Sequence, residues 1–314
     1  MNLTRRTFLG GITAAAIGPR LLASTKAAID PDLTVFISDV HVNGLIPDSY
    51  QFKRFSRTIA DILKLDPLPA RVICFGDLAF LYGRKEDYLR SAPGLQLLAD
   101  AGIQVTIGMG NHDRRSTFLE VHPRYAQTTK VPGRIVSVVD AGRVDFIMLD
   151  GLQGTDDRSL TDMGPGSGRL DPAQEEWLKN ALPKWQKPVF VCSHFPINEL
   201  TVGKQKLAKF LKQCPAVAGY LHGHDHRWYK TLPILDWGRN TSLRTLCLPS
   251  TGHWGDIGFT TFRTTADLAV ASLRQYEYFF PNPEPKRPED RRLWDIITAE
   301  NQNQTCSFIL PKLG

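Results

Sequence analysis

The segment AVAGYLHGHDH, residues Ala216–His226, joins a short apolar run to a cluster of histidines. Three of the eight histidines of the chain, His222, His224 and His226, fall within five residues here. A neutral imidazole is the commonest protein ligand for transition metals, but His-rich tracts also occur on solvated loops. The segment therefore predicts a buried strand, and its histidines indicate a metal site only if partners for them exist elsewhere in the chain.

Four other apolar runs of strand length end in residues of the same chemical kind. The runs are Leu33–Ser38, Arg71–Phe75, Ile103–Met109 and Pro188–Cys192, followed by DVH, GD, GNHD and SH, respectively. Apolar runs that alternate with helical segments are typical of the buried strands of an α/β fold, and ligands gather at the carboxyl edge of such sheets. Seven side chains of metal-binding type should therefore converge. They are Asp39, His41, Asp77, Asn111, His194, His224 and His226.

Further strands indicate a second sheet. Two pairs are predicted, Arg134–Val139 with Val144–Leu149 and Ser242–Leu248 with Phe259–Arg263, and Leu268–Tyr278 is expected to extend the same sheet. Apolar residues at helical spacing follow two of the earlier strands, and we predict helices there. A further helix is expected to begin after Asp171, because Asp is a favoured N-cap and Pro172 suits the first helical position.

The N-terminus has the pattern of an export signal. Residues 1–18, MNLTRRTFLGGITAAAIG, place a twin arginine before an apolar run that is too short to span a bilayer. Thr4–Leu9 resembles the bacterial twin-arginine signal. We expect a signal peptide over 1–28, passage through the twin-arginine translocase, a periplasmic or extracellular location, and no membrane association after cleavage. The alternative is a basic N-terminal arm.

Composition narrows the classes of function that remain possible. Residues 1–28 hold four basic and no acidic residues, so the net charge of +6 falls to about +2 without them. There is no basic stripe interleaved with aromatic residues, so nucleic acid is not an expected partner. None of the five cysteines forms a CxxC pair, and Cys74 and Cys192 lie in apolar runs, as buried free thiols do. We expect one catalytic domain over 29–280 and a proline-rich extension over 281–314 with a short helix at Glu289–Thr298.

The ligand types indicate the metal. Imidazole combined with carboxylate and amide oxygen suits Mn, Fe or Zn, whereas a set of oxygens alone would favour Mg or Ca. Seven such side chains exceed the number that one first-row ion takes from a protein, and they suit two ions if a central carboxylate bridges them. Two ions about 3.5–4 Å apart can clamp the attacking and leaving oxygens of a phosphoryl displacement.

The ordered series DVH, GDL, GNHD, SH and GHDH is similar to the calcineurin-like metallophosphoesterase family, over residues 33–263. This resemblance implies a four-layer αββα sandwich of two mixed sheets flanked by helices, and two divalent transition-metal ions. One ion would be held by Asp39, His41, Asp77 and His226, and the other by Asn111, His194 and His224, with Asp77 bridging. A hydroxide between the ions would attack a small phosphate ester.

The resemblance also implies roles for side chains around the metals. His112 would contact the phosphoryl group or assist the leaving group, and Asp113 would orient its ring. His253 and Arg114 are further candidates for the substrate pocket. His222 lies outside the GHxH motif, and we expect it to be a strand-end residue or a partner of a ligand.

The middle of the chain points to a subfamily. Leu149-Asp150 and the segment Gly168–Leu178, GRLDPAQEEWL, are similar to class III cyclic-nucleotide phosphodiesterases and glycerophosphodiesterases. Trp177 and Leu178 are also expected simply to pack a helix on the sheet. The match supports a subfamily and does not establish a substrate. We expect phosphodiester hydrolysis, with phosphomonoester hydrolysis as a close alternative. A catalytically silent metal-binding module is the third possibility.

Overall fold

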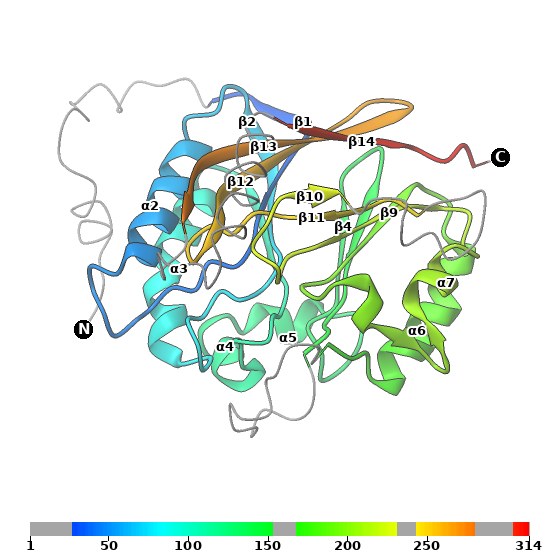
Figure 1. Cartoon of the computed structure of the whole chain (residues 1–314), viewed down its shortest axis with the longest axis horizontal. Coiled ribbons are helices and arrows are strands. Elements are labelled where there is room, and N and C mark those ends of the chain that lie inside the picture. Colours follow the sequence, from blue (N-terminus) through cyan, green and yellow to red (C-terminus); the bar gives the residue numbers. More distant parts are fainter. Residues whose placement is uncertain (1–26, 153–167, 231–242, 280–303, 314) are drawn as a thin grey trace, which may run out of the picture.

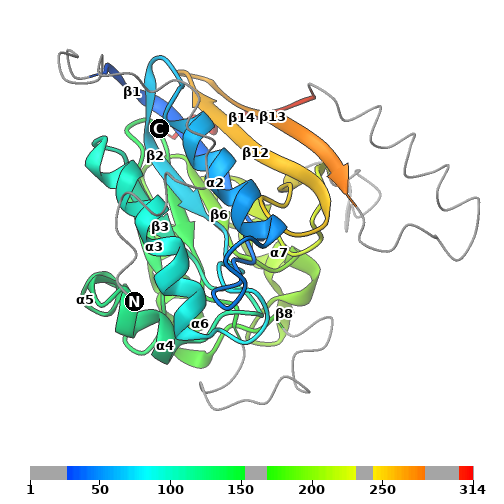
Figure 2. The ribbon, with the colours of Figure 1, turned by 90° about the vertical axis from the view of Figure 1, so that its left-hand side faces the viewer.

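Two stacked sheets with helices on their outer faces form the core of the molecule (Figure 1). The computed structural model describes residues 27–152, 168–230, 243–279 and 304–313. Helices α2 (Tyr50–Ile62) and α3 (Lys85–Asp100) lie side by side across the first sheet (Figure 2). Helices α6 (Pro172–Ala181) and α7 (Leu207–Leu211) cover the second sheet. The predicted four-layer αββα sandwich is confirmed.

The first sheet has the strand order β14-β13-β12-β1-β2-β3. Its three parallel strands are β1 (Ile29–Ile37), β2 (Leu68–Cys74) and β3 (Gln104–Ile107). Three antiparallel strands continue it beyond β1, namely β12 (Gly255–Thr264), β13 (Leu268–Phe279) and β14 (Thr305–Ile309). The parallel strands bring their carboxyl ends to one edge, where the predicted ligands begin.

The second sheet has the strand order β10-β11-β9-β6-β5-β4. Its strands are β4 (Ser137–Asp140), β5 (Asp145–Met148), β6 (Val189–Cys192), β9 (Val217–His222), β10 (Tyr229–Lys230) and β11 (Thr245–Cys247). The strands β5, β6, β9 and β11 run parallel to one another. The connections include α4 (Arg115–Val121), α5 (Arg124–Thr128), the short helices η3 (Leu182–Lys184) and η4 (Ile197–Glu199), and the hairpin of β7 (Thr201–Val202) and β8 (Gln205–Lys206).

The division of strands between the sheets corrects the sequence analysis. The predicted pairing of Ser242–Leu248 with Phe259–Arg263 is wrong, because β11 pairs with β9 and β12 pairs with β1. Both sheets are covered on two faces, so their strands show the same continuous apolar pattern, which does not say which sheet a strand joins. The fold also continues past residue 280, because β14 pairs with β13.

Three apolar layers hold the sandwich together. Between the sheets, the ring of Phe36 from β1 packs against Phe146 of β5 and Phe262 of β12, with ring centroids 5.4 and 5.0 Å apart. The other two layers lie between each sheet and its helices. All five cysteines are buried and free, as expected for Cys74 and Cys192. The twin-arginine segment and the predicted helix Glu289–Thr298 lie outside the described residues.

Candidate metal centre

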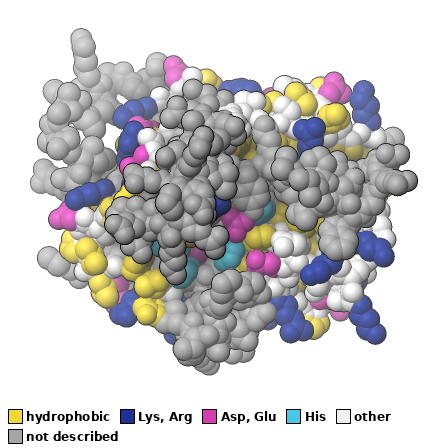
Figure 3. Space-filling view, viewed as in Figure 1, with side chains coloured by type: hydrophobic (Ala, Val, Ile, Leu, Met, Phe, Trp, Pro, Cys, Tyr) yellow, Lys and Arg dark blue, Asp and Glu magenta, His cyan; other side chains and the backbone are white. Residues whose placement is uncertain are grey.

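The predicted ligands meet where the carboxyl ends of both sheets come together. Asp39 and His41 follow β1, Asp77 follows β2, Asn111 follows β3, His194 follows β6, and His224 and His226 follow β9. On the face drawn in Figure 3, histidine and acidic side chains reach the surface together near the middle of the molecule. The stacking of the two sheets therefore joins residues that are separated by up to 187 positions in the chain.

The backbone at these positions is unusual. Among the described residues, the non-glycine residues with positive φ are Asp39, His41 and Asp77, each at 49°, His224 at 72° and His226 at 56°. A side chain in this left-handed region costs roughly 1–2 kcal/mol, and such residues cluster at functional sites. All five are predicted ligands, so the loops accept strain to direct these side chains inward.

One half of the centre contains Asp39, His41, Asp77 and His226. His226 Nε2 lies 3.1 Å from Asp39 Oδ1 and 3.3 Å from His41 Nε2. His41 Nε2 lies 3.4 Å from Asp77 Oδ2. Four ligand atoms from three different loops thus surround one point.

The other half shares the carboxylate of Asp77. The same Asp77 Oδ2 lies 3.3 Å from His194 Nε2. Asn111 Oδ1 lies 2.9 Å from both His194 Nε2 and His224 Nδ1, and the two imidazole nitrogens are 3.1 Å apart. Asp77 Oδ2 therefore faces both sets of ligands, which is the position of a bridging carboxylate.

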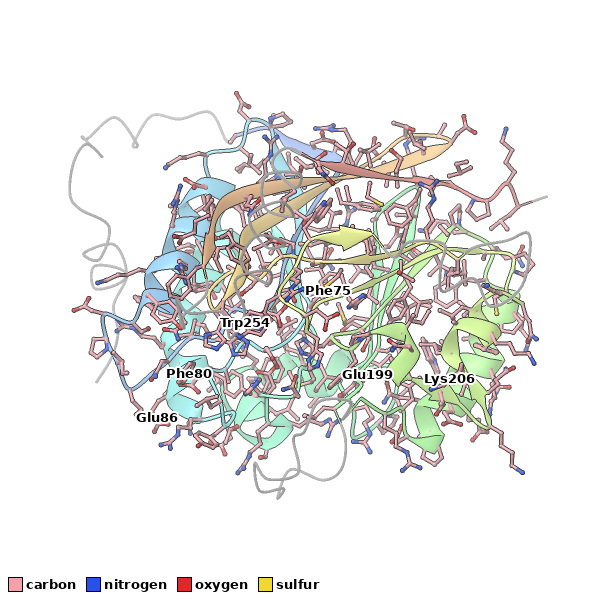
Figure 4. All side chains as sticks on the ribbon, in the orientation of Figure 1. Phe75, Phe80, Glu86, Glu199, Lys206 and Trp254 are labelled. Atoms are coloured by element: carbon pink, nitrogen blue, oxygen red, sulfur yellow. The ribbon has the colours of Figure 1, made fainter. Side chains whose placement is uncertain are left out.

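Backbone carbonyls fix the direction in which the imidazole lone pairs point. His41 Nδ1 lies 2.9 Å from Phe80 O, and His226 Nδ1 lies 3.1 Å from Trp254 O; both carbonyl residues are labelled in Figure 4. A carbonyl oxygen only accepts hydrogen bonds, so each Nδ1 carries the hydrogen and the neutral ring keeps its lone pair on Nε2. When both rings are neutral, two lone pairs face each other across 3.3 Å and cannot form a hydrogen bond.

A cation between the two rings would accept both Nε2 lone pairs. Ligand distances of about 2.0–2.2 Å around a transition metal place neighbouring ligand atoms about 2.8–3.1 Å apart in octahedral geometry and about 3.3–3.6 Å apart in tetrahedral geometry. The nitrogen and oxygen atoms of this site are 2.9–3.4 Å apart. His194 follows the same rule, since its Nδ1 lies 3.0 Å from the carbonyl of Phe75. The residues present therefore fit divalent transition-metal ions in both halves.

Electrostatics keeps the carboxylates charged. Burial alone would raise the pKa of Asp39 and of Asp77, but His226 beside Asp39 and His194 beside Asp77 lower both pKa values below their usual range. Burial likewise opposes the charge on His194, yet Asp77 and Asp39 raise the pKa of this imidazole to about 9 in the metal-free protein. The centre thus holds two buried negative charges ready for cations.

His112 lies at the edge of the metal centre. Its ring centroid is 4.9 Å from that of His41, and its backbone N donates to Asp77 Oδ1 at 2.8 Å. Its Nδ1 lies 3.1 Å from Leu81 O. The ring is therefore oriented by a backbone carbonyl, and not by Asp113 as we expected. This leaves Nε2 of His112 as the ring atom available to a substrate.

Asp113 instead joins two ligand loops. Its buried carboxylate accepts hydrogen bonds from Gly110 N at 2.9 Å, from Ala79 N at 3.1 Å and from the hydroxyl of Tyr88 at 3.1 Å. Tyr88 also accepts from Arg114 N at 2.9 Å. The loops after β2 and β3, which carry Asp77 and Asn111, are thus held together by one buried carboxylate. Tyr88 had no signal in the sequence, because it lies on a helix that carries no motif.

The two candidate pocket residues differ in their surroundings. The ring centroid of His253 lies 4.5 Å from that of His41, and its Nδ1 lies 3.2 Å from the hydroxyl of Tyr50. Its backbone O accepts from Arg54 at 2.8 Å, so the residue is held on two sides. Arg114 is half-buried next to Gly83. The partner Tyr50 was missed, because an exposed tyrosine at a helix start carries no pattern.

Asp150 and the start of α6 form a structural network with Arg115. Arg115 pairs with the buried carboxylate of Asp150 through Nε at 2.6 Å and through Nη2 at 2.7 Å. Gln174 of α6 donates to Asp150 O at 2.7 Å and accepts from Asp150 N at 3.0 Å. Asp171 caps α6 by accepting from Gln174 N, and Leu178 is fully buried, as predicted. The motif therefore connects the GNHD loop to the second sheet.

Comparisons with solved structures give only distant likenesses. TT1561 of Thermus thermophilus has a TM-score of 0.46 and 11% identity, covering 73% of this chain and 93% of that chain. Vps29 of Chaetomium thermophilum has a TM-score of 0.41 and 12% identity, covering 89% of this chain and 96% of that chain. Vps29 of Cryptosporidium parvum has a TM-score of 0.40 and 12% identity, covering 90% and 98%. With scores this low, none of them carries an argument about activity.

The family model is the decisive comparison. No curated protein matches the chain. The model described as calcineurin-like phosphoesterase matches residues 33–228. This range runs from β1 to the residue before β10 and contains all seven side chains of the metal centre. The chain belongs to the calcineurin-like phosphoesterase family.

Proposed function

We propose that this chain is a metal-dependent hydrolase of phosphodiesters. The observation that carries the proposal is the sharing of Asp77 Oδ2 between two sets of ligands, 3.4 Å from His41 Nε2 on one side and 3.3 Å from His194 Nε2 on the other. Two divalent ions, when bound, supply Lewis acidity at phosphoryl oxygens and activate water. Mn, Fe and Zn are the ions that suit these ligands.

His112 is the residue to which we assign proton delivery. Leu81 O takes the hydrogen on its Nδ1, so any proton that His112 exchanges with a substrate is at Nε2. His112 N donates to Asp77 Oδ1, which fixes the position of this ring relative to the ligands. A protonated Nε2 would donate to the leaving-group oxygen as its bond to phosphorus breaks.

The arginines near the site are one support for a diester over a monoester. At neutral pH a monoester carries close to two negative charges and a diester one. Two nearby arginines are already engaged by protein acceptors, Arg115 by Asp150 and Arg54 by the backbone of His253 and by Glu277. Arg114, which the sequence analysis gives as a pocket candidate, would be the residue to meet the second charge of a monoester.

Rates on three substrates test the proposal. We expect kcat/KM for bis-p-nitrophenyl phosphate and cyclic AMP to exceed that for p-nitrophenyl phosphate with Mn present. A preference for the monoester that is lost in Arg114→Ala would instead establish the phosphatase alternative. A protein that holds two equivalents of metal and hydrolyses none of the three would be the catalytically silent module.

Export is a separate part of the proposal. The support is the twin arginine at Arg5 and Arg6 followed by a short apolar run. Among the described residues no helix is long and apolar enough to cross a membrane. Replacing both arginines by lysine should retain the protein inside a bacterial host, and N-terminal sequencing of exported protein should begin near residue 29. Unchanged export of the double variant would contradict a twin-arginine route.

A further inference from the structure

A second group of ligand-type side chains lies beside the metal centre, behind the loop that carries two of its histidines. His222 ends β9 and Cys247 ends β11, and the two are direct neighbours in the sheet. Asp225 lies between the ligands His224 and His226 in the chain. A ring nitrogen of His222, a carboxylate oxygen of Asp225 and the Sγ atom of Cys247 all lie within 4.8 Å of one another.

Two of these side chains are held in positions that suit a metal. His222 Nδ1 lies 2.9 Å from Gly223 O, so it carries the hydrogen and Nε2 keeps a lone pair. Metal-binding histidines are commonly fixed in this way by a carbonyl. Cys247 is fully buried, and this burial together with the charges of Asp225 and Asp39 raises the pKa of its thiol, which donates to Gly223 O at 3.4 Å. The backbone N–H groups of Asp225 and Arg227 offset part of this rise and would donate to a metal-bound thiolate.

We propose that His222, Asp225 and Cys247 bind one further divalent cation of the Zn²⁺ type, separate from the two ions of the binuclear centre. Thiolate combined with imidazole selects a borderline-soft ion such as Zn²⁺ over Mg²⁺, Ca²⁺ or Mn²⁺. The thiol releases its proton to solvent as the sulfur–metal bond forms. Three protein ligands leave the fourth tetrahedral position for water, on the side where Asp225 is half-exposed.

The charges at this cluster balance. A thiolate and a carboxylate together neutralise a divalent ion, so the guanidinium of Arg227, which is near Asp225 and Cys247, meets no net positive charge. The backbone turn is already formed, because Asp225 N donates to Gly223 O at 2.9 Å. An ion here would tie the loop that carries His224 and His226 to the ends of β9 and β11.

Cobalt substitution gives a specific readout of this site. A Co²⁺ ion with a thiolate ligand shows sulfur-to-metal charge-transfer absorption in the near ultraviolet, and the seven side chains of the binuclear centre contain no sulfur. We expect the full-length metal-free protein to take up three equivalents of Co²⁺ and to develop this band. Cys247→Ser should bind two equivalents and show no band. Cys306→Ser, which removes another buried thiol, should behave as wild type.

A second variant covers the case in which Cys247→Ser does not fold. His222→Gln keeps the thiol and should lose the third equivalent of Co²⁺ together with most of the band. Wild-type protein saturated with cobalt but lacking the band, or a band that survives in Cys247→Ser, would overturn the proposal. Hydrolysis is scored separately, since a missing band in an active enzyme rejects this cation site and leaves the proposed function intact.

Discussion

The histidines of the metal centre and His122 show how differently a buried imidazole can be used. At the centre, carbonyls hold the Nδ1 atoms of His41 and His226, and the Nε2 atoms point at carboxylates. His122, between α4 and α5, is packed against the rings of Phe118 and Tyr125, and its buried Nε2 has no hydrogen-bond partner. His122 carries no motif in the sequence, and the folded chain leaves it half-buried.

The difference lies in charge. Asp77 and Asp39 give the central histidines a negative surrounding, whereas the neighbours of His122 are apolar rings and Arg124. Burial, with a smaller contribution from Arg124, lowers the pKa of His122 to about 4. One environment is built to bind cations, and the other keeps an imidazole neutral. Variants in each region should therefore change different properties.

The largest effect is expected at Asp77. Asp77→Asn removes the charge shared by both halves of the centre, and ions of this kind contribute several kcal/mol to phosphoryl transfer. We expect kcat/KM to fall by at least about 1,000-fold, which corresponds to about 4 kcal/mol, with loss of bound metal. Asp140→Asn, at an exposed carboxylate, is the matched control. Near-normal rates and two equivalents of metal in Asp77→Asn would contradict the bridging assignment.

The next largest effect is expected when Gly110 is replaced by alanine. A Cβ atom at Gly110 would lie 2.1 Å from Asp77 Oδ1 and 2.5 Å from Asp77 N, so the bridging residue must move in Gly110→Ala. We expect a loss of about 3 kcal/mol in the free energy of unfolding together with reduced metal content. Gly142→Ala, at φ +73° with nothing within 4 Å, should cost only about 1 kcal/mol and keep its metal. Urea denaturation and metal analysis would measure both, and equal losses would mean that the close approach of Gly110 to Asp77 adds no cost of its own.

His122 should control stability in mild acid. Its pKa is about 4 in the folded protein against 6.5 for an ordinary histidine, so folding favours the neutral ring. The contribution of the neutral His122 ring to the free energy of unfolding is fully present above pH 6.5. It is lost as the pH falls towards 4, with about 2 kcal/mol lost at pH 5. We expect His122→Phe to lose less stability than wild type between pH 7 and pH 5. The free energy of unfolding of both proteins is measured by urea denaturation at each pH. If the values for wild type and His122→Phe change in parallel, the His122 ring does not titrate in this range.

The smallest effect concerns the support beneath the ligand loops. Tyr88→Phe removes the hydroxyl that joins Asp113 to Arg114 N, and we expect a loss of about 1–2 kcal/mol in the free energy of unfolding. Tyr82→Phe, at an exposed tyrosine, is its control. If the two variants unfold at the same urea concentration, the hydrogen bond from the Tyr88 hydroxyl to Asp113 does not stabilise the fold.

Residues at strand ends were the most predictable part of the molecule. Asp39 and His194 follow apolar runs, and the meeting of parallel strand ends at one edge made their convergence foreseeable. The sheet to which β12 belongs could not be predicted, because the buried strands of both sheets have the same apolar pattern. The contact of His112 with Leu81 O was also out of reach, since any backbone carbonyl can accept from a ring and only the folded chain selects one.

The left-handed backbone of Asp39, His41, Asp77, His224 and His226 also has an evolutionary consequence. Each of these conformations costs free energy at a non-glycine residue, and binding of cations at the site would offset that cost. In a relative that has abandoned metal binding, selection would no longer oppose glycine or asparagine at these five positions, since both relax the backbone. Glycine or asparagine at these five positions would then mark, in the sequence of a relative, the loss of metal binding at this site.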